Sequence, residues 1–129
     1  MKGTNTAIGG GGFPHVAVRL TDFDASVRFY TQALGFTPRI SWGAGDGRAA
    51  MLDTGDGNYL ELFAGGAPAP APAAGAKPPA GSVLHFALRT SDCDAAVERA
   101  RRAGARITVE PKDVDIPSTP VTKVRIAFC

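Results

Sequence analysis

The chain has 129 residues, enough for one domain with a buried core and too few for two full domains. Its formal net charge of +2 comes mostly from arginines scattered along the sequence without a basic–aromatic motif, and its apolar runs are shorter than the ~20 residues that span a bilayer. We therefore expect a globular protein that binds neither nucleic acid nor a membrane.

Residues 1–12 are predicted to be a flexible tail. They are rich in glycine and have no apolar central stretch, so they do not form a secretory signal. Cys93 and Cys129 are the two cysteines, and neither has the spacing of a zinc or redox motif. Two reduced thiols without a signal sequence predict a cytoplasmic protein.

Residues 13–63 are predicted to form a first βαβββ module. Apolar and polar residues alternate over residues 15–20, as they do in a half-buried strand. Asp22 then provides a helix N-cap, and Gly35 ends a helix whose apolar residues recur at helical spacing. Glycine-rich turns separate three further strand candidates, at residues 36–42, 48–53 and 58–63.

A low-complexity Ala/Pro/Gly linker over residues 64–82 leads to a second, incomplete βαβββ module over residues 83–129. The predicted elements of this module are a strand at 83–90, a helix at 94–103, strands at 106–110 and 122–128, and a proline-containing loop at 113–120. The counterpart of the strand around Glu61 would fall just past residue 129, so we expect the last strand to be missing from the chain. Together the two modules would make one structural domain.

An internal repeat opens both modules. The segment HVAVRLTDFDASV begins at His15 and the segment HFALRTSDCDAAV begins at His85, and the chain has only these two histidines. A repeat of this kind indicates two copies of one supersecondary unit. It places the two histidines at equivalent positions, so we treat them as a pair.

The carboxylate of Glu61 complements this pair. In the segment NYLELF, Leu60 and Leu62 are predicted to face the core, which leaves Glu61 on the opposite side among apolar neighbours. A carboxylate there needs a cation or a hydrogen-bond donor. Two neutral imidazoles and one carboxylate suit a divalent metal, so His15, Glu61 and His85 are the candidate metal ligands. The alternative is that each histidine is an ordinary hydrogen-bonded strand residue.

Three arginines and four large side chains are candidates for binding the substrate. By strand parity Arg19, Arg89 and Arg125 share the face of the histidines and could meet an anionic substrate. Alternatively, they reach solvent or pair with Asp22 and Asp92. The remaining candidates could line an apolar pocket, or they could simply pack within the protein. They are Trp42, Met51, Tyr59 and Phe63.

The two module openings resemble those of the vicinal-oxygen-chelate superfamily. The first reads HVAVRLTDFDASVRFYTQALGF from His15, with an FYxxxLGF ending, and the second reads HFALRTSDCDAAVERARRAGA. This superfamily includes glyoxalase I, bleomycin-resistance proteins, type I extradiol dioxygenases and fosfomycin-resistance enzymes. The resemblance extends from Phe13 to Cys129 and implies an α+β fold in which two βαβββ modules form a curled mixed sheet around a cleft.

The resemblance also implies a metal site. In glyoxalase-type members two histidines and two glutamates bind a divalent ion; three of these positions match His15, Glu61 and His85, and the fourth has no residue in this sequence. The ion would be Zn, Ni, Co, Mn or Fe, and it would stabilise the enediolate formed when a proton leaves the carbon next to a carbonyl. Glu61 is the candidate catalytic residue that would move this proton.

We therefore expect a glyoxalase-like lyase or isomerase that acts on a small α-hydroxycarbonyl or thiol adduct. One alternative is an iron(II) extradiol-type dioxygenase, although its carboxylate ligand lies on the final strand. Another is a bleomycin-resistance-type protein that binds an antibiotic or other small molecule, although such proteins usually lack the metal ligands. An open sheet edge and the resemblance both predict a homodimer, with each site built within one chain or across two.

Overall fold

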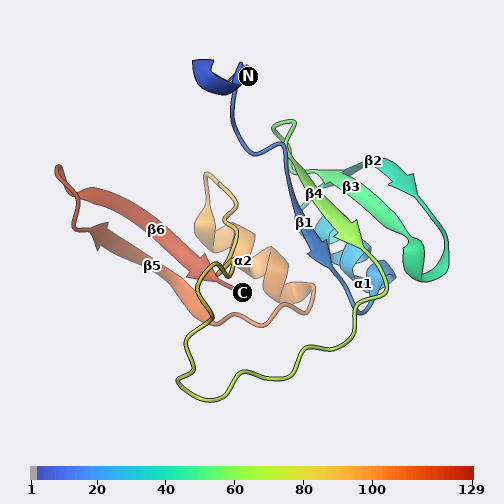
Figure 1. Cartoon of the computed structure of the whole chain (residues 1–129). Helices are drawn as coiled ribbons and strands as arrows, with labels where there is room; N and C mark the ends of the chain where they lie inside the picture. The colour runs from blue at the N-terminus through green and yellow to red at the C-terminus, as the bar shows by residue number, and fades with distance from the viewer. Residues whose placement is uncertain (1–2) are drawn as a thin grey trace.

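The structure, a computed structural model, describes residues 3–129 and has an α+β fold with one four-stranded mixed sheet and one two-stranded sheet (Figure 1). None of the described helices is long and apolar enough to cross a bilayer. The elements follow in the order η1 (Thr6–Ile8), β1 (His15–Arg19), α1 (Phe23–Arg28), η2 (Phe29–Ala33), β2 (Thr37–Trp42), η3 (Gly45–Gly47), β3 (Ala49–Asp53), β4 (Tyr59–Phe63), α2 (Cys93–Arg102), β5 (Val109–Ile116) and β6 (Thr122–Phe128).

The predicted tail over residues 1–12 contains one short ordered piece. Residues 1–2 lie outside the described part of the chain. Asn5 caps the single turn η1 through a hydrogen bond from the backbone N–H of Ala7 to its side chain. A bridge between Asn5 and Gly10 closes this turn, which is exposed and stands apart from the sheet (Figure 1).

The strands predicted in the first module form the four-stranded sheet, in the order β1-β4-β3-β2. β1 runs parallel to β4, whereas β3 is antiparallel to both β4 and β2. The Asp22 side chain accepts a hydrogen bond of 2.9 Å from the N–H of Ala25, which fixes the start of α1. The helix continues as the π-helical turn η2 and stops at Gly35, whose φ of 72° lies in the left-handed region.

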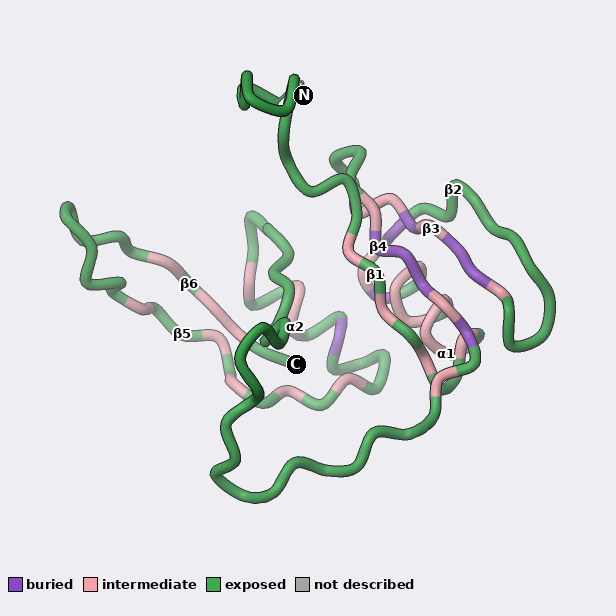
Figure 2. The backbone as a smooth tube through the Cα atoms, viewed as in Figure 1, coloured by how far each residue is buried: buried purple, intermediate pink, exposed green. Residues whose placement is uncertain are grey.

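The core lies between the four-stranded sheet and the α1–η2 helix. Alternate residues of the central strands are buried on this side, and Figure 2 shows the buried backbone concentrated on β3 and β4. The prediction that Leu60 and Leu62 face the core is confirmed. The buried cluster comprises Phe36, Ala50, Leu52, Leu60 and Leu62, and the partly buried side chains packed against it are Val18, Leu20, Phe23, Val27, Tyr30 and Leu34.

The second module begins differently from its prediction, because residues 83–90 form no strand in the structure. Their alternating sequence matches that of β1, but a strand also needs a neighbouring edge to satisfy its N–H and C=O groups. In this single chain no edge pairs with them, and Val83 and Leu84 are exposed. The alternation therefore encodes a strand that this arrangement leaves unpaired.

The rest of the second module contains α2 and a β5–β6 hairpin. Asp92 caps α2 through a 2.9 Å hydrogen bond from the N–H of Ala95, which repeats the cap at the start of α1. β6 occupies the predicted residues, but β5 begins at Val109 and extends to Ile116, so the predicted strand at 106–110 and loop at 113–120 were misplaced. Cross-strand pairing with β6 continues through Ile116, which pairs with Thr122, and only residues 117–121 form the turn.

One hydrogen bond joins the helices of the two modules. The Nε of Arg99 on α2 donates to the carbonyl of Ala33 at the end of η2, over 2.9 Å. The intervening residues 64–82 have no helix or strand, and after Gly66, whose N–H donates to the carbonyl of Leu20, the chain leaves the four-stranded sheet (Figure 1). Among residues 3–129, β1 pairs with β4 only, so its other edge has no strand beside it.

Leu62→Ala should destabilise the protein by about 3 kcal/mol, because this fully buried side chain would leave a cavity in the core. Urea unfolding followed by circular dichroism measures the change. Ile8→Ala, at an exposed position outside the sheet, is the control and should change the free energy of unfolding by less than about 0.5 kcal/mol. Equal effects of the two substitutions would contradict this placement of the core.

Candidate functional site

The parallel pairing of β1 with β4 brings His15 and Glu61 together. The register aligns Ala17 with Glu61, and the small Ala17 side chain leaves room for the neighbouring imidazole. The Nε2 of His15 lies 3.6 Å from the Oε2 of Glu61. These two predicted metal ligands are therefore adjacent, although they stand far apart in the sequence.

Glu61 is buried although it carries a carboxylate. Its exposed fraction is 9%, and it is the buried charged residue on the sheet. Within residues 3–129, His15 is the one basic side chain within 4.0 Å of this carboxylate. Burying a carboxylate is costly unless a cation or a hydrogen-bond donor compensates it, so a cation bound beside this pair would be stabilising.

The sheet face opposite the core carries most of the other predicted site residues. Strand pairing aligns Met51 with Glu61 and places Ile40 beside Met51, in one row across the sheet. A second row holds Trp42, Ala49 and Phe63. Ile40 was missed by the sequence analysis, although the parity of β2 could have placed it on this face.

Tyr59 and Arg19 stand at the two ends of this face. Tyr59 is aligned with His15 and is partly buried. The guanidinium of Arg19 lies 5.4 Å from the centre of the Phe63 ring, and its Nη1 donates a 2.9 Å hydrogen bond to the carbonyl of Ala64. Arg19 is thus held over an aromatic ring while remaining largely exposed.

His85 does not reach the other two predicted ligands in this structure. Its ring packs edge-to-face on Phe128, with 5.5 Å between the ring centres. In the described part of the chain, no three His, Cys, Asp or Glu side chains converge as metal ligands. The structure therefore assembles His15 with Glu61 and leaves His85 on the second module.

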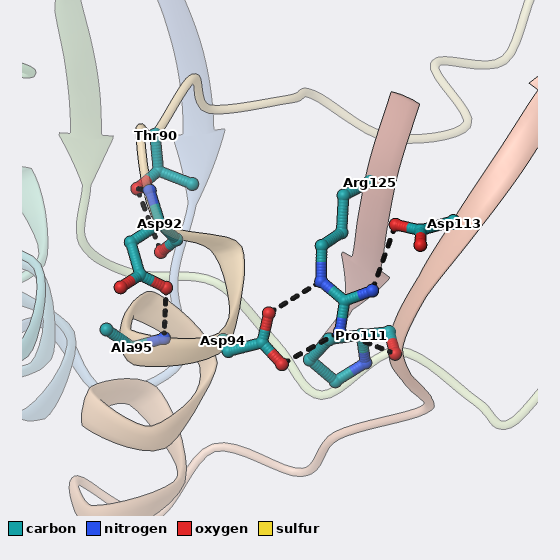
Figure 3. A network of polar contacts seen from close by, with 7 residues as sticks. All are labelled: Thr90, Asp92, Asp94, Ala95, Pro111, Asp113 and Arg125. Atoms are coloured by element: carbon teal, nitrogen blue, oxygen red, sulfur yellow. Dashed lines mark hydrogen bonds and ion pairs between the residues drawn. The ribbon is translucent and has the colours of Figure 1, made fainter. Parts of the chain in front are cut away.

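Arg89 and Arg125 both pair with carboxylates. Arg89 makes an exposed contact of 3.9 Å with Asp56. Arg125 makes a denser set of contacts, shown in Figure 3: its Nε and Nη2 donate to the two oxygens of Asp94 over 2.6 and 2.8 Å, and its Nη1 donates to Asp113 over 3.0 Å. Arg125 thus connects α2 with both strands of the hairpin, and its substrate contact remains a prediction.

Two shallow hollows on the described surface lie over the helices and not on the open sheet face. They measure about 290 Å³ and about 260 Å³. Their linings come from α1, η2 and the end of α2, and they contain no His, Cys, Asp or Glu. We therefore base the candidate site on the open sheet face, where the histidine and the buried carboxylate meet.

A family model identifies the superfamily to which the chain belongs. Residues 12–119 match the sequence profile of the Glyoxalase/Bleomycin resistance protein/Dioxygenase superfamily. No curated protein sequence matches the chain. Among solved structures, a glyoxylase/bleomycin resistance protein/dioxygenase domain from Frankia sp. EAN1pec is 26% identical, with a TM-score of 0.57, and the alignment covers 83% of this chain and 82% of that one.

Two further solved structures share the fold. TioX from Micromonospora sp. ML1 is 25% identical, with a TM-score of 0.51, and the alignment covers 84% of this chain and 83% of TioX. UcmS2 is 21% identical, with a TM-score of 0.54, and the alignment covers 83% of this chain and 84% of UcmS2. The likeness therefore extends over both modules.

Arg125→Gln should reduce the pH dependence of the stability of the contact between α2 and the hairpin. Hydrogen bonds from Arg125 lower the pKa of Asp94, so the stability that this carboxylate contributes is present above about pH 4 and is lost as the pH falls through its lowered value. Amide hydrogen exchange of β6 between pH 2 and pH 6 would measure this loss. Arg102→Gln, an exposed position on α2, should keep the wild-type profile. Identical profiles in wild type and Arg125→Gln would contradict the role of this pair.

Proposed function

Because the chain belongs to the Glyoxalase/Bleomycin resistance protein/Dioxygenase superfamily, we propose that it is a metal-dependent lyase or isomerase of glyoxalase type. Its substrate would be a small molecule with two vicinal oxygens, such as an α-hydroxycarbonyl compound or a thiol adduct. The observation that carries the proposal is the contact between His15 and the buried Glu61, over 3.6 Å. A largely buried carboxylate beside an imidazole is an arrangement that a bound cation would stabilise.

The donor chemistry of this pair fits a divalent metal. An imidazole nitrogen and a carboxylate oxygen are ligands for Zn, Ni, Co, Mn and Fe alike. His85 is the proposed third ligand, and it would join the site once residues 83–90 pair as a strand. A bound metal would supply Lewis-acid stabilisation of the negative charge that develops on the substrate oxygens.

The residues of the open face have separate roles in this proposal. Glu61, the proposed catalytic residue, would take the proton from the carbon next to the substrate carbonyl and return it to the neighbouring position. Most of the Glu61 side chain is buried, which limits its contact with water. Arg19 and Tyr59 would orient the substrate from the two ends of the face, and the proposed roles of Arg89 and Arg125 require them to leave their present carboxylate partners.

The proposal includes a homodimer. The outer edge of β1 has no strand beside it among the described residues, and the alternating segment 83–90 has no edge to pair with. An exposed edge and an unpaired strand-like segment are complementary, and a second copy of the chain supplies both. Residues 64–82 would allow this exchange, because an extended Pro-rich linker spans about 3 Å per residue. The free thiols of Cys93 and Cys129 support the further proposal of a cytoplasmic location.

A binding protein of bleomycin-resistance type is the second candidate. The exposed side chains of Trp42 and Ile40 on the open face favour it, because a small-molecule binder needs apolar surface of this kind. In that case the face would hold its ligand without a metal. Metal analysis of the purified protein therefore separates the two candidates.

Purified protein should bind close to one equivalent of zinc, nickel or cobalt per chain, as measured by elemental analysis after dialysis. His15→Ala, His85→Ala and Glu61→Gln should each lower the affinity for the metal about tenfold or more, because each removes a proposed ligand. Glu98→Gln, which alters an exposed glutamate on α2, is the matched control and should bind as the wild type does. A wild-type protein that binds none of these ions would contradict the proposal and favour the binding protein, whereas stoichiometric, oxygen-sensitive iron would favour a dioxygenase.

Mixing two variants that each lack one metal ligand tests whether the metal sites are built across a dimer. If His15 of one copy meets His85 of the other, His15→Ala and His85→Ala refolded together should recover roughly a quarter of the wild-type metal sites. Half of the dimers would be mixed, and each of these would hold one intact site. Sites built within single chains would give no recovery, which would overturn the exchange while leaving the metal proposal intact. Light scattering on the wild type checks the dimer itself.

A further inference from the structure

We infer that the ligand of this site carries an aromatic ring, which packs on Trp42 and Phe63 beside Glu61. The inference rests on the proposed function, because it assigns the part of the substrate that lies next to the vicinal oxygens. The ligand class is an aryl-substituted α-hydroxycarbonyl compound, of which mandelate is a simple example.

The sheet register produces an aromatic platform next to the carboxylate. Trp42 and Phe63 lie on either side of Ala49 in one row across the sheet. Because Ala49 has only a methyl group, the two rings meet above it edge-to-face, with 6.2 Å between their centres. Ala49 is 1% exposed, as expected for a residue beneath two rings. We call Trp42 and Phe63 the aromatic platform.

The platform lies one row from the metal-binding pair. Glu61 and Phe63 are two residues apart on β4, so their side chains leave the same face about 7 Å from each other. If the vicinal oxygens of a ligand lie at Glu61, the substituent on the adjacent carbon would lie over the aromatic platform. A single ring attached directly to the hydroxyl-bearing carbon has this reach.

The exposure of the platform indicates that it binds something. Trp42 is 42% exposed and Ile40 is 54% exposed, on the same face as the buried carboxylate. Large apolar side chains grouped on one face mark binding surfaces more often than chance exposure does.

The chemistry of the platform favours an aryl group over an alkyl group. Two rings in edge-to-face contact offer a third ring the same favourable geometry, which a saturated ring of similar size cannot use. Arg19 completes the row, with its guanidinium over the outer side of Phe63. A cation at this end favours an electron-rich ring and disfavours a positively charged one.

Mandelate and hexahydromandelate test the inference, since they share the hydroxyl and carboxylate groups and differ in the ring. Trp42 is the only tryptophan of the chain, so its fluorescence reports directly on the platform. In zinc-loaded protein we expect mandelate to bind about fivefold more tightly than hexahydromandelate and to shift the Trp42 emission. Phe63→Leu should reduce this preference to less than about twofold, with unchanged zinc content. Phe29→Leu, which replaces an aromatic side chain on η2, is the matched control and should keep the preference.

Zinc-free protein separates a failure of this inference from a failure of the metal proposal. We expect p-nitrobenzyl alcohol, which lacks the vicinal oxygens, to quench Trp42 saturably in wild type and not in Phe63→Leu. Saturable quenching in a protein that binds no metal would support the platform and contradict only the metal site. Stoichiometric zinc with equal affinity for the two mandelates would overturn the aryl preference alone. A Trp42 that acrylamide cannot reach in the ligand-free protein would also overturn it, because the face would then be covered by protein.

Discussion

The parallel pairing of β1 with β4 is the constraint on which the rest of this structure depends. Two parallel neighbours cannot be joined by a tight turn, so the chain between them must pass through α1, η2, β2 and β3 before it returns. That passage supplies the helix that covers one face of the sheet and the strands that widen it. The same pairing aligns β1 with Glu61 and so determines which histidine meets the carboxylate. Core and site are therefore set by one strand register, and a slip of one residue would reverse both faces.

The two faces of β4 have opposite energetic roles. Leu60 and Leu62 lose nearly all contact with water against the helix and contribute several kcal/mol of hydrophobic stabilisation. Glu61 lies between them in the sequence and is almost as deeply buried, on the side where no helix covers the sheet. A methionine there would pack beside Met51 without any cost of desolvating a charge. The carboxylate thus lowers the stability of a fold that does not need it, which is the pattern expected of a functional residue.

The sequence predicted the first module more accurately than the second, for a physical reason. In residues 13–63 each strand finds its neighbours within the same segment, so local alternation and turn residues are sufficient to place it. Residues 83–90 carry the same alternation as β1 but form no strand, because the pairing edge must come from elsewhere. The repeat correctly indicated equivalent helix caps at Asp22 and Asp92, yet equivalence within two modules does not determine how the modules meet. Whether His15 and His85 meet therefore could not be predicted from the repeat.

The contacts between the two modules are too weak to fix the position of the second module by themselves. The Arg99–Ala33 hydrogen bond contributes about 1 kcal/mol, and the contact between Arg89 and Asp56 is exposed and screened by solvent, so the two together fall far below the packing free energy of the first core. A ligand or metal that binds only when His85 joins His15 adds its own binding free energy to one placement of the second module. Because these contacts are weak, that addition would be large enough to favour the placement in which the two histidines meet. Ligation and strand pairing at the β1 edge would then form together, and the metal site would be a product of assembly as well as of sequence.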